Sequence, residues 1–443
     1  MKILLANLPH KDKFVIEGRC QRKRSVRTKN LLPPITLAYI SSLLEGKAKI
    51  MVIDSDAQSL GLDDFLKRVS EYKPDYIMAS VSTPTIDNDM HVLKEVKIIS
   101  PKTLNVIFGI HASYFAKDLI ENDSVDFVIK GEPELTAAEI PFKNPKQISG
   151  LVFKRNEKMF ETKNRELLDM DNLPYPDWDK IGLEPYKVLF TNRKYLTIVF
   201  SRGCPHGCSF CTAPFYYGSK SRVRKIDSVI KEIEFMKRNY GVNEFLIYSD
   251  NFIFNKDSVK KLCRRIIEED LEIRWMCATR VDGVDDETLE IMKKSGCWLI
   301  SFGIESGSQT ILNKNMKNIT IEKSREAVGK AKKMGIITYG HFIFGLPGET
   351  EETIKETLDF STSIGLDFAD FYIATPFPGS KLFEDCKHLK SIDWSKFEYN
   401  TSVLDNNLKL EDFQRRAYLR FYFRPSTLFR LLRVMLKKRL RMI

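Results

Sequence analysis

Five apolar runs of four to six residues recur along the first 140 residues, separated by segments with apolar residues at helical spacing. Strands buried on both faces have such near-continuous apolar sequences, and their alternation with helices is typical of a parallel sheet. The pattern predicts an α/β fold that begins with a doubly wound, Rossmann-like domain at residues 1–145. The predicted strands are Lys2–Asn7, Lys49–Ile53, Tyr76–Val81, Asn105–Gly109 and Asp126–Ile129, and the predicted helices are Ile35–Leu44, Leu62–Tyr72 and Asp87–Ser100.

A second alternation of strands and helices, with units of regular length, predicts another domain at residues 191–380. Six consecutive βα units indicate a partial (β/α)6 barrel, whose site lies at the carboxyl ends of the strands. The predicted strands are Tyr195–Phe200, Glu244–Ser249, Ile273–Ala278, Trp298–Gly303, Thr338–Phe344 and Asp370–Ala374. The predicted helices are Asp227–Arg238, Asp286–Lys294, Thr320–Lys333 and Thr350–Ile364.

The rest of the chain connects or follows these two domains. Residues 146–190 are expected to form a β-hairpin that turns near Asn156-Glu157, and then a proline-containing linker at Leu168–Trp178. Residues 381–443 are expected to form a small helical C-terminal region with a basic amphipathic tail.

The composition is that of an ordinary globular protein, with 443 residues of which 43% are hydrophobic and 29% charged. We expect no secretory signal and no membrane span, because no apolar run is long enough for either. Eight cysteines, three of them clustered, do not resemble a disulfide framework, so a cytoplasmic location is expected. The scattered cysteines are interpreted mainly as core residues; they are Cys20, Cys263, Cys277, Cys297 and Cys386.

The net charge of +11 comes from two basic segments. Phe413–Ile443 contains ten Lys or Arg and no acid, and Arg19–Lys29 contains six, so the rest of the chain is mildly acidic and nucleic acid is not an expected partner. The tail at Pro425–Ile443 has cations on one helical face, which indicates peripheral contact with an anionic membrane, or else a helix packed on the body or a solvated tail. Arg19–Lys29 is interpreted as a lid or a second anionic contact.

The segment Ser201–Cys211, SRGCPHGCSFC, places Cys204, Cys208 and Cys211 at C-x3-C-x2-C spacing directly after an apolar strand. Three thiolates leave a tetrahedral zinc site one ligand short, whereas they hold a 4Fe–4S cluster by three corners and leave one iron open for chemistry. A zinc knuckle or three unrelated thiols is the alternative that this loop alone leaves open.

Polar or glycine-rich residues follow all six predicted barrel strands, as a ligand-lined barrel mouth requires. The candidates are Asp250, Asn251, Thr279, Arg280, Glu305, Ser306, Gly345, Pro347 and Glu349. Taken singly, each has a structural alternative: Asp250 can cap a helix, and Arg280 can pair with Asp282.

A crevice is expected at the carboxyl ends of the first sheet's strands, where doubly wound folds bind ligands. Its candidates are Asn7, Pro9, Ser82, Thr83, Gly109, His111, Gly131 and Glu132. None belongs to a G-x-G-x-x-G motif or a P-loop, which argues against nicotinamide or nucleoside-triphosphate binding.

The cysteine loop, with Phe210 before the last cysteine, resembles the radical S-adenosylmethionine (SAM) superfamily. The segments YSDNFIF, SFGIESGS, FIFGLPGET and ATPFPGS resemble the subgroup that has a cobalamin-binding domain before the barrel, over about residues 1–425. GIHAS resembles that subgroup's GG-x-H-A-T segment, with Ile110 in place of the second glycine.

The resemblance implies that the three cysteines ligate the 4Fe–4S cluster and that SAM occupies its open iron. It implies SAM contacts from Phe210, Asp250, Asn251, Arg280, Glu305, Ser306, Gly345 and Pro347. The crevice of the first domain would hold cobalamin. A corrinoid Asp-x-His-x-x-Gly motif is absent, because His91 and His111 lack its flanking residues, so a Rossmann-like domain that only positions substrate is the alternative.

The resemblance further implies a cobalamin-dependent C-methyltransferase. Reductive cleavage of SAM gives a 5′-deoxyadenosyl radical that abstracts a substrate hydrogen, and methylcobalamin supplies the methyl group. The alternatives are a cyclase or rearrangement enzyme with the same cofactors, and a non-catalytic zinc-binding scaffold. Expected partners are a flavodoxin or ferredoxin and a small-molecule or lipid substrate.

Overall fold

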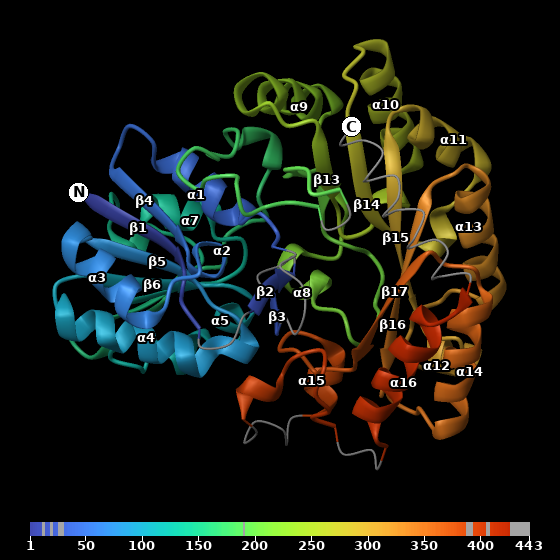
Figure 1. The fold of residues 1–443 in the computed structure, drawn as a ribbon. Helices are drawn as coiled ribbons and strands as arrows, with labels where there is room; N and C mark the ends of the chain where they lie inside the picture. The colour runs from blue at the N-terminus through green and yellow to red at the C-terminus, as the bar shows by residue number, and fades with distance from the viewer. Residues whose placement is uncertain are drawn as a thin grey trace. The chain divides into compact units, whose positions relative to one another are not determined.

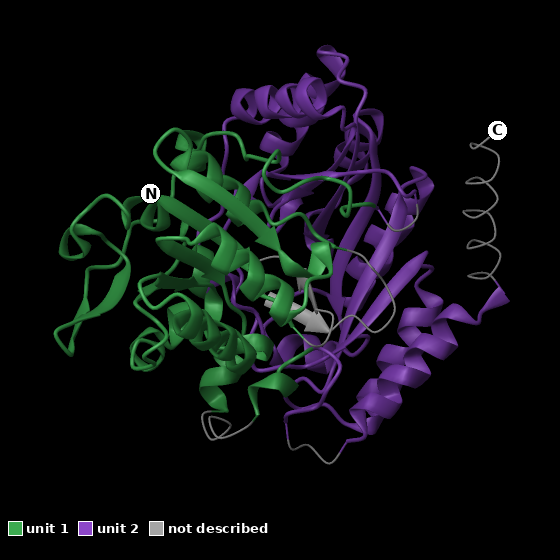
Figure 2. Cartoon of the chain, turned by 60° about the vertical axis from the view of Figure 1, so that its left-hand side comes forward, with its two compact units in different colours: residues 1–187, 215–218, 377–398 green, residues 188–214, 219–376, 399–443 purple. Residues whose placement is uncertain are grey.

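The computed structural model describes residues 1–10, 14–17, 21–24, 31–188, 191–386, 393–404 and 408–425. The chain forms two compact units, which Figure 2 colours separately. Unit 1 comprises residues 1–187, 215–218 and 377–398, and unit 2 comprises residues 188–214, 219–376 and 399–443. Each unit is built on its own large sheet (Figure 1).

Unit 1 contains a seven-stranded sheet in the order β4-β1-β5-β6-β7-β8-β9. Its first five strands are parallel and follow the doubly wound order 2-1-3-4-5, with the switch point between β1 and β5. The parallel strands are β1 Lys2–Asn7, β4 Lys49–Asp54, β5 Tyr76–Ser80, β6 Leu104–Phe108 and β7 Phe127–Ile129. The longer helices are α1 Ile35–Leu44, α3 Leu62–Tyr72 and α4 Ile86–Ile99. All these elements match the sequence prediction to within one or two residues.

The predicted hairpin is confirmed, with β8 at Leu151–Arg155 and β9 at Lys158–Glu161. Asn156 and Glu157 both have positive φ, 52° and 60°, as a two-residue hairpin turn requires. The hairpin does not stand apart from the sheet, because β8 pairs antiparallel with β7.

The segment predicted as a linker packs into unit 1. Trp178 is completely buried, and the Asp177 carboxylate accepts a hydrogen bond from Ser41 Oγ at 2.7 Å. The two prolines prevent regular structure here, but burial of an indole ring stabilises a fixed path.

Unit 2 contains six parallel strands whose order in the sheet follows their order in the chain, as in a partial barrel. They are β10 Leu196–Val199, β13 Glu244–Tyr248, β14 Arg274–Arg280, β15 Cys297–Glu305, β16 Ile337–Phe344 and β17 Phe368–Ile373. The helices that follow the strands are α9 Ile226–Tyr240, α10 Lys256–Glu268, α11 Asp286–Lys294, α12 Gln309–Lys314, α13 Ile321–Lys333 and α14 Glu351–Ser363. The six predicted strands are confirmed, and α10 and α12 are additions to the predicted helices.

The two faces of this sheet differ in burial. On β16, Thr338, Gly340 and Phe342 are buried, and a Cβ built on Gly340 would lie 2.4 Å from Leu366, in the segment that leads from α14 to β17. The alternate residues, which include Tyr339 and His341, are only half-buried. We call their face, opposite the helices, the inner face of the sheet (Figure 1).

Among the described residues no seventh strand pairs with the free edge of β17, which is covered by side chains and by the Tyr399 carbonyl, an acceptor for the Ile373 N–H at 2.7 Å. Tyr422, on α16 (Leu410–Tyr422), donates to the Ala369 carbonyl at 2.8 Å and accepts from the Ala369 N–H at 3.2 Å. Gln414 donates to the Phe371 carbonyl at 2.7 Å. These bonds satisfy backbone groups that an edge strand otherwise exposes.

The remaining elements are short. They are α2 Ser55–Gln58, α5 Ile110–Tyr114, α6 Ala116–Leu119, α7 Glu134–Glu139, α8 Ala213–Tyr217, α15 Lys381–Asp385, and the strand pairs β2 Phe14–Glu17 with β3 Gln21–Arg24 and β11 Ser201–Arg202 with β12 Arg222–Val223. Within unit 1, Phe383 and Trp394 from the segment 377–398 pack their rings against Phe115.

Some sequence predictions fall on residues that the structure does not describe. The basic tail at 426–443 and Cys20 lie outside the described residues, and of Arg19–Lys29 only the stretch that forms β3 is described. Cys263, Cys277 and Cys297 are buried in unit 2, as predicted. Within the described ranges, no helix is long and apolar enough to cross a membrane.

Candidate active site

The cysteine loop begins at the carboxyl end of β10. The first turn after the strand is fixed by Gly203, whose φ of +89° suits glycine and whose N–H donates to Asp250 Oδ2 at 2.7 Å. Farther along, the Cys211 N–H donates to the Cys208 carbonyl at 3.1 Å. Asp250 follows β13, so the neighbouring strand holds the start of the cysteine loop.

The donor set of this loop fits a 4Fe–4S cluster. The backbone of His206 hydrogen-bonds Cys204, the Ala213 N–H lies 3.5 Å from Cys211 Sγ, and an Arg280 guanidinium nitrogen lies 3.6 Å from Cys208 Sγ. Such N–H groups stabilise the cysteine sulfurs that ligate a cluster. Over the described ranges, no three His, Cys, Asp or Glu side chains converge on a single metal ion. A cubane does not need such convergence, since each cysteine binds a different iron.

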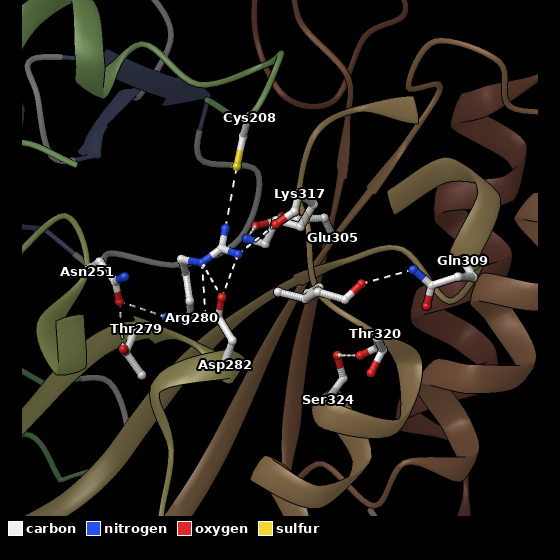
Figure 3. Close-up of polar contacts among 11 residues, drawn as sticks. Cys208, Asn251, Thr279, Arg280, Asp282, Glu305, Gln309, Lys317, Thr320 and Ser324 are labelled. Carbon is white, nitrogen blue, oxygen red and sulfur yellow. Dashed lines mark hydrogen bonds and ion pairs between the residues drawn. The ribbon is translucent and has the colours of Figure 1, made fainter. Parts of the chain in front are cut away.

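Asn251 and Thr279 link the ends of β13 and β14. Asn251 Oδ1 accepts from Thr279 Oγ1 at 2.9 Å and from the Arg280 N–H at 3.2 Å (Figure 3). Thr279 Oγ1 in turn accepts from the Ile253 N–H at 3.1 Å. The predicted site residues Asn251 and Arg280 are therefore brought together, and the amide oxygen of Asn251 is engaged in holding the strand ends.

Arg280 connects the cysteine loop to the next strands. Its guanidinium forms an ion pair with Asp282 at 2.8 Å, donates to the Lys317 carbonyl at 2.6 Å and reaches Cys208 Sγ (Figure 3). The pKa of Asp282 is lowered by Arg280 against the opposing effect of burial. Arg280 therefore pairs with Asp282, which was its structural alternative, and it also contacts Cys208, a candidate cluster ligand.

Glu305 forms a buried ion pair at the end of β15. Lys317 Nζ donates to Glu305 Oε1 at 2.7 Å, and the two side chains are 5% and 11% exposed (Figure 3). Glu305 has a φ of +69°, a left-handed conformation that side chains other than glycine seldom adopt and that is concentrated at functional sites. Gly303 makes room for the pair, because a Cβ there would lie 2.7 Å from Glu305 Oε1.

Ser306 lies apart from these groups. Its hydroxyl is 3.1 Å from that of Thr357 on α14 and accepts the Ser308 N–H at 3.1 Å. Ser306 therefore connects the end of β15 to a helix, and no hydrogen bond recorded for the described residues joins its side chain to the cysteine loop or to Arg280.

The Gly345–Glu349 segment after β16 is joined to the cysteine loop by Asn315. Asn315 accepts from Ser209 Oγ at 2.9 Å and donates to the Pro347 carbonyl at 3.2 Å. The Gly345 N–H donates to Glu349 Oε2. Burial raises the pKa of Glu349 to about 8, so this carboxyl is protonated at neutral pH.

At the switch point of unit 1, Asn7 ends β1 with its side chain completely enclosed. The exposed fraction of Asn7 is 1%, and within the part of the chain that the structure describes neither its amide nitrogen nor its amide oxygen has a hydrogen-bond partner. A buried side-chain amide without partners is costly, and a polar ligand at this edge would satisfy it. This orphaned amide fits the binding of a polar cofactor such as cobalamin there.

The neighbouring strand ends carry a second group of predicted crevice residues. Ser82 and Thr85 share a hydrogen bond of 2.8 Å, and Thr83 Oγ1 lies 3.2 Å from His111 Nδ1. His111 follows Gly109, whose φ of +132° begins α5. Burial lowers the pKa of His111 to about 3, so its ring is neutral.

The remaining crevice candidates have structural partners. The Pro9 carbonyl accepts from Asn88 Nδ2 at 2.9 Å. The Gly131 N–H donates to Ser113 Oγ at 3.0 Å, and Glu132 Oε2 accepts the Leu168 N–H at 2.8 Å.

Several residues of the site were not predicted from the sequence. Lys317 and Asn315 lie on loops after α12, where no strand end marks them. His10 follows Pro9, one of the predicted crevice residues, and its ring lies 3.5 Å from the Asp89 carboxylate. Phe210, in contrast, was predicted from its place in the loop, and it is half-buried there.

Two family descriptions match the chain. Residues 24–140 match the B12 binding domain, and residues 198–361 match the Radical SAM superfamily. The first covers most of the parallel sheet of unit 1, and the second covers the cysteine loop and the strands β13 to β16.

Curated relatives align with most of the chain. An uncharacterised methyltransferase of Pyrococcus horikoshii is 32% identical, over 97% of this chain and 94% of the relative. The cytidylyl-2-hydroxyethylphosphonate methyltransferase of Streptomyces wedmorensis is 27% identical, over 80% and 77%. The anaerobic magnesium-protoporphyrin IX monomethyl ester cyclase of Rubrivivax gelatinosus is 26% identical, over 89% and 75%.

Solved structures share the fold. The radical S-adenosylmethionine methyltransferase TsrM of Kitasatospora setae has a TM-score of 0.69 at 18% identity, covering 88% of this chain and 77% of its own. The cobalamin-dependent S-adenosylmethionine radical enzyme OxsB has a TM-score of 0.66 at 17% identity, covering 89% and 56%.

Proposed function

The chain belongs to the radical SAM superfamily with an N-terminal B12-binding domain, and we propose that it is a cobalamin-dependent C-methyltransferase of a small-molecule substrate. Its cofactors are a 4Fe–4S cluster, SAM and cobalamin. The observation that carries the proposal is the cysteine loop at the end of β10, which hydrogen bonds join to the ends of β13 and β14. When bound, the cluster and SAM supply a 5′-deoxyadenosyl radical, and cobalamin supplies a methyl group.

We propose that Cys204, Cys208 and Cys211 ligate the cluster and that Asp250 and Arg280 position them. Asp250 holds the start of the loop through Gly203, and the Arg280 guanidinium contacts Cys208 Sγ. Of the further SAM contacts proposed, Glu305 is the best supported, because its left-handed backbone and buried ion pair fix a carboxylate beside Gly303. The other proposed SAM contacts are Phe210, Asp250, Asn251, Arg280, Gly345 and Pro347, and Ser306 through its backbone, because its hydroxyl is engaged by Thr357.

We propose that cobalamin binds at the switch point of unit 1. The completely buried, unpartnered amide of Asn7 supports this placement. Ser82, Thr83 and His111 would form the adjoining wall, since they lie at the ends of the next two strands. The other proposed contacts are Pro9, Gly109, Gly131 and Glu132.

Anaerobic purification and reconstitution test the cofactor assignments. The full chain should bind iron and sulfide, retain the absorption bands of added cobalamin, and convert SAM to 5′-deoxyadenosine under a strong reductant. Alanine at Cys204, Cys208 or Cys211 should abolish deoxyadenosine formation, whereas alanine at the buried Cys263 leaves the cluster ligands in place and serves as the matched control. Zinc without labile sulfide would favour a metal-binding scaffold and refute the assignment.

Methyl transfer is tested with SAM that carries a fully deuterated methyl group. Cell extract incubated with the reduced enzyme should yield a metabolite or lipid with a deuterated methyl group, found by mass spectrometry. Turnover without label would favour cyclisation or rearrangement, which the similarity to anaerobic cyclases makes the second candidate. A flavodoxin or ferredoxin should replace the chemical reductant as electron donor.

We also propose that the basic tail at residues 426–443 contacts anionic membranes. The support is its sequence alone, which places cations on one helical face without acids. Co-sedimentation with phosphatidylserine vesicles should be lost on deletion of residues 426–443. Equal sedimentation of the two chains would contradict the proposal.

A further inference from the structure

A half-buried polar cluster on the inner face of β16 and β17 has no role in the site described above. It consists of Tyr339 and His341 from β16 and Asp370 and Tyr372 from β17, with Tyr418 reaching in from α16. A buried polar network in which every member is satisfied is structural, but one with a vacant acceptor is a candidate ligand site.

The hydrogen bonds determine the direction of donation in this cluster. Tyr372 donates its hydroxyl proton to Asp370 Oδ2 at 3.0 Å, and Tyr418 donates to Asp370 Oδ1 at 3.1 Å. Tyr372 Oη also lies 3.2 Å from His341 Nδ1. Because a tyrosine hydroxyl has one proton, and Asp370 takes it, Tyr372 must accept the second bond from the Nδ1–H of His341.

This arrangement fixes the tautomer of the imidazole. A neutral histidine that carries its proton on Nδ1 leaves Nε2 as an acceptor with a free lone pair. Among the described residues, Nε2 of His341 has no hydrogen-bond partner, and the ring is only half-buried. The vacant acceptor is therefore preorganised by the protein itself.

The strand register places His341 next to the proposed SAM-binding groups. His341 pairs with Gly303 on β15 and with Asp370 on β17. Gly303 has no side chain, and the Glu305–Lys317 ion pair lies beside it. Because the Lys317 carbonyl also accepts from Arg280, which contacts Cys208, a continuous series of contacts within unit 2 leads from the cysteine loop to the neighbour of His341.

We propose that His341 is a substrate-binding residue whose Nε2 accepts a hydrogen bond from an O–H or N–H of the substrate, and that Tyr372 and Asp370 are its positioning residues. This inference rests on the proposed function. It assigns the substrate to the class of compounds that carry a hydroxyl or N–H group. The proton stays on the substrate, so no further reactant is needed.

The neighbouring inner-face residues add to this picture. On β14, the alternate positions Met276 and Ala278 are half-buried and exposed, and both are apolar. The inner face is thus apolar only at the middle of β14, between Arg274 and Arg280, and it is polar near β17. A substrate that combines an apolar part with a hydrogen-bond donor matches this distribution.

Chemical labelling of the full chain tests the vacant acceptor without any substrate. Diethyl pyrocarbonate modifies the unprotonated ring nitrogen of an accessible histidine, and peptide mass spectrometry gives the rate at each site. His341 should be labelled in the wild type, and it should also be labelled in Tyr372→Phe, because loss of the acceptor for Nδ1–H lets the proton move to Nε2 and leaves Nδ1 unprotonated, so spectroscopy must tell the two nitrogens apart. The control is Tyr418→Phe, which removes another hydroxyl from Asp370 but leaves the Tyr372–His341 bond.

Spectroscopy on the same variants reads the tautomer directly. In protein labelled with 15N-histidine, the unprotonated nitrogen of His341 should be Nε2 in the wild type and in Tyr418→Phe, and Nδ1 in Tyr372→Phe. Folding of each variant is checked by circular dichroism. Absence of His341 labelling in the wild type, the same unprotonated nitrogen in the wild type and Tyr372→Phe, or an Nε2–H tautomer in the wild type would overturn the proposal.

The deuterated product of the extract assay tests the substrate class. That product should carry a hydroxyl or N–H group. His341→Phe should lower its yield at least about tenfold, and His341→Gln, whose amide oxygen replaces Nε2 as acceptor, should restore most of it. A product without such a donor would refute the inference while the methyltransferase assignment holds. A chain with labelled His341 but no methylated product would refute the methyltransferase assignment, and with it the substrate role of the acceptor.

Discussion

Replacing Lys317 by methionine isolates the energetic role of the buried ion pair beside Gly303. Methionine keeps an apolar stem of similar length but removes the ammonium group that donates to Glu305 at 2.7 Å. The carboxylate then stays in a position where its side chain is 11% exposed. Removing one partner of a buried pair costs about 3–5 kcal/mol, because the other charge is left without compensation.

The expected size of the effect follows from this cost. At about 2–4 °C per kcal/mol for a unit of this size, Lys317→Met should lower the midpoint of thermal unfolding by about 6–20 °C. The double variant Lys317→Met with Glu305→Gln removes both charges and should recover most of the loss. The double-mutant cycle should give a coupling free energy of about 2–3 kcal/mol.

Circular dichroism and urea denaturation of the four proteins in the cycle measure these differences. The control is Lys314→Met, at an exposed lysine three residues earlier, and its midpoint should stay within about 2 °C of the wild type. If Lys317→Met shifted the midpoint no more than Lys314→Met, or if the double variant were as unstable as the single one, the ion pair would not be the buried, coupled interaction described.

Three further predictions concern other parts of the chain. In the folded protein Glu349 keeps its proton up to about pH 8, whereas in the unfolded chain it releases the proton near pH 4.5, so the free energy of unfolding falls as pH rises between these values. From pH 6 to pH 8 the free energy of unfolding of the wild type, measured by urea denaturation, should fall by about 2 kcal/mol. The variant Glu349→Gln should not show this fall. Tyr422→Phe leaves the Ala369 N–H and carbonyl unpaired and should speed hydrogen exchange in β17 about tenfold or more, by mass spectrometry. Asn315→Ala frees the two loops that Asn315 bridges and should lower the iron retained after gel filtration, whereas alanine at the exposed Asn313 should not.

The strands of unit 1 could be predicted because burial on both faces produces near-continuous apolar runs, and those of unit 2 because apolar strands recur at regular intervals between helices. Lys2–Asn7 and Ile35–Leu44 were predicted with the bounds that the structure gives. The helix at Lys256–Glu268 was overlooked although Val259, Leu262 and Ile266 are buried at helical spacing, so its signal was present in the sequence.

Site residues could be predicted from the sequence where they directly follow a predicted strand. They were predicted less well where their place depends on which side chains meet in the folded chain. Asp250 and Arg280 were expected at strand ends, and they contact the cysteine loop. Ser306 was predicted with Glu305 as a SAM contact, and its hydroxyl hydrogen-bonds Thr357 on α14, since successive residues of an extended chain point to opposite sides. The sequence does not show which helix residue a side chain at a strand end will meet.

His341 is a second residue whose surroundings could not be predicted from the sequence. In the sequence it is one polar residue inside an apolar strand, and a single histidine there is usually a core residue with satisfied nitrogens. Only the β16–β17 register brings it beside Asp370 and Tyr372, and only the hydrogen-bond directions show that Nε2 is vacant.

Gln414 and Tyr422, whose side chains cover the edge of β17, are synthesised well after the strand that they cover. The last strand of unit 2 ends at Ile373, but Gln414 and Tyr422 emerge from the ribosome some 40 residues or more later. During that interval the sheet presents an uncovered edge, which is the kind of surface that recruits strands from other chains. A chain truncated between β17 and α16 would keep all six strands and every proposed cluster ligand, yet it would be prone to aggregate. Completion of unit 2 thus depends on a segment that contributes no strand to it.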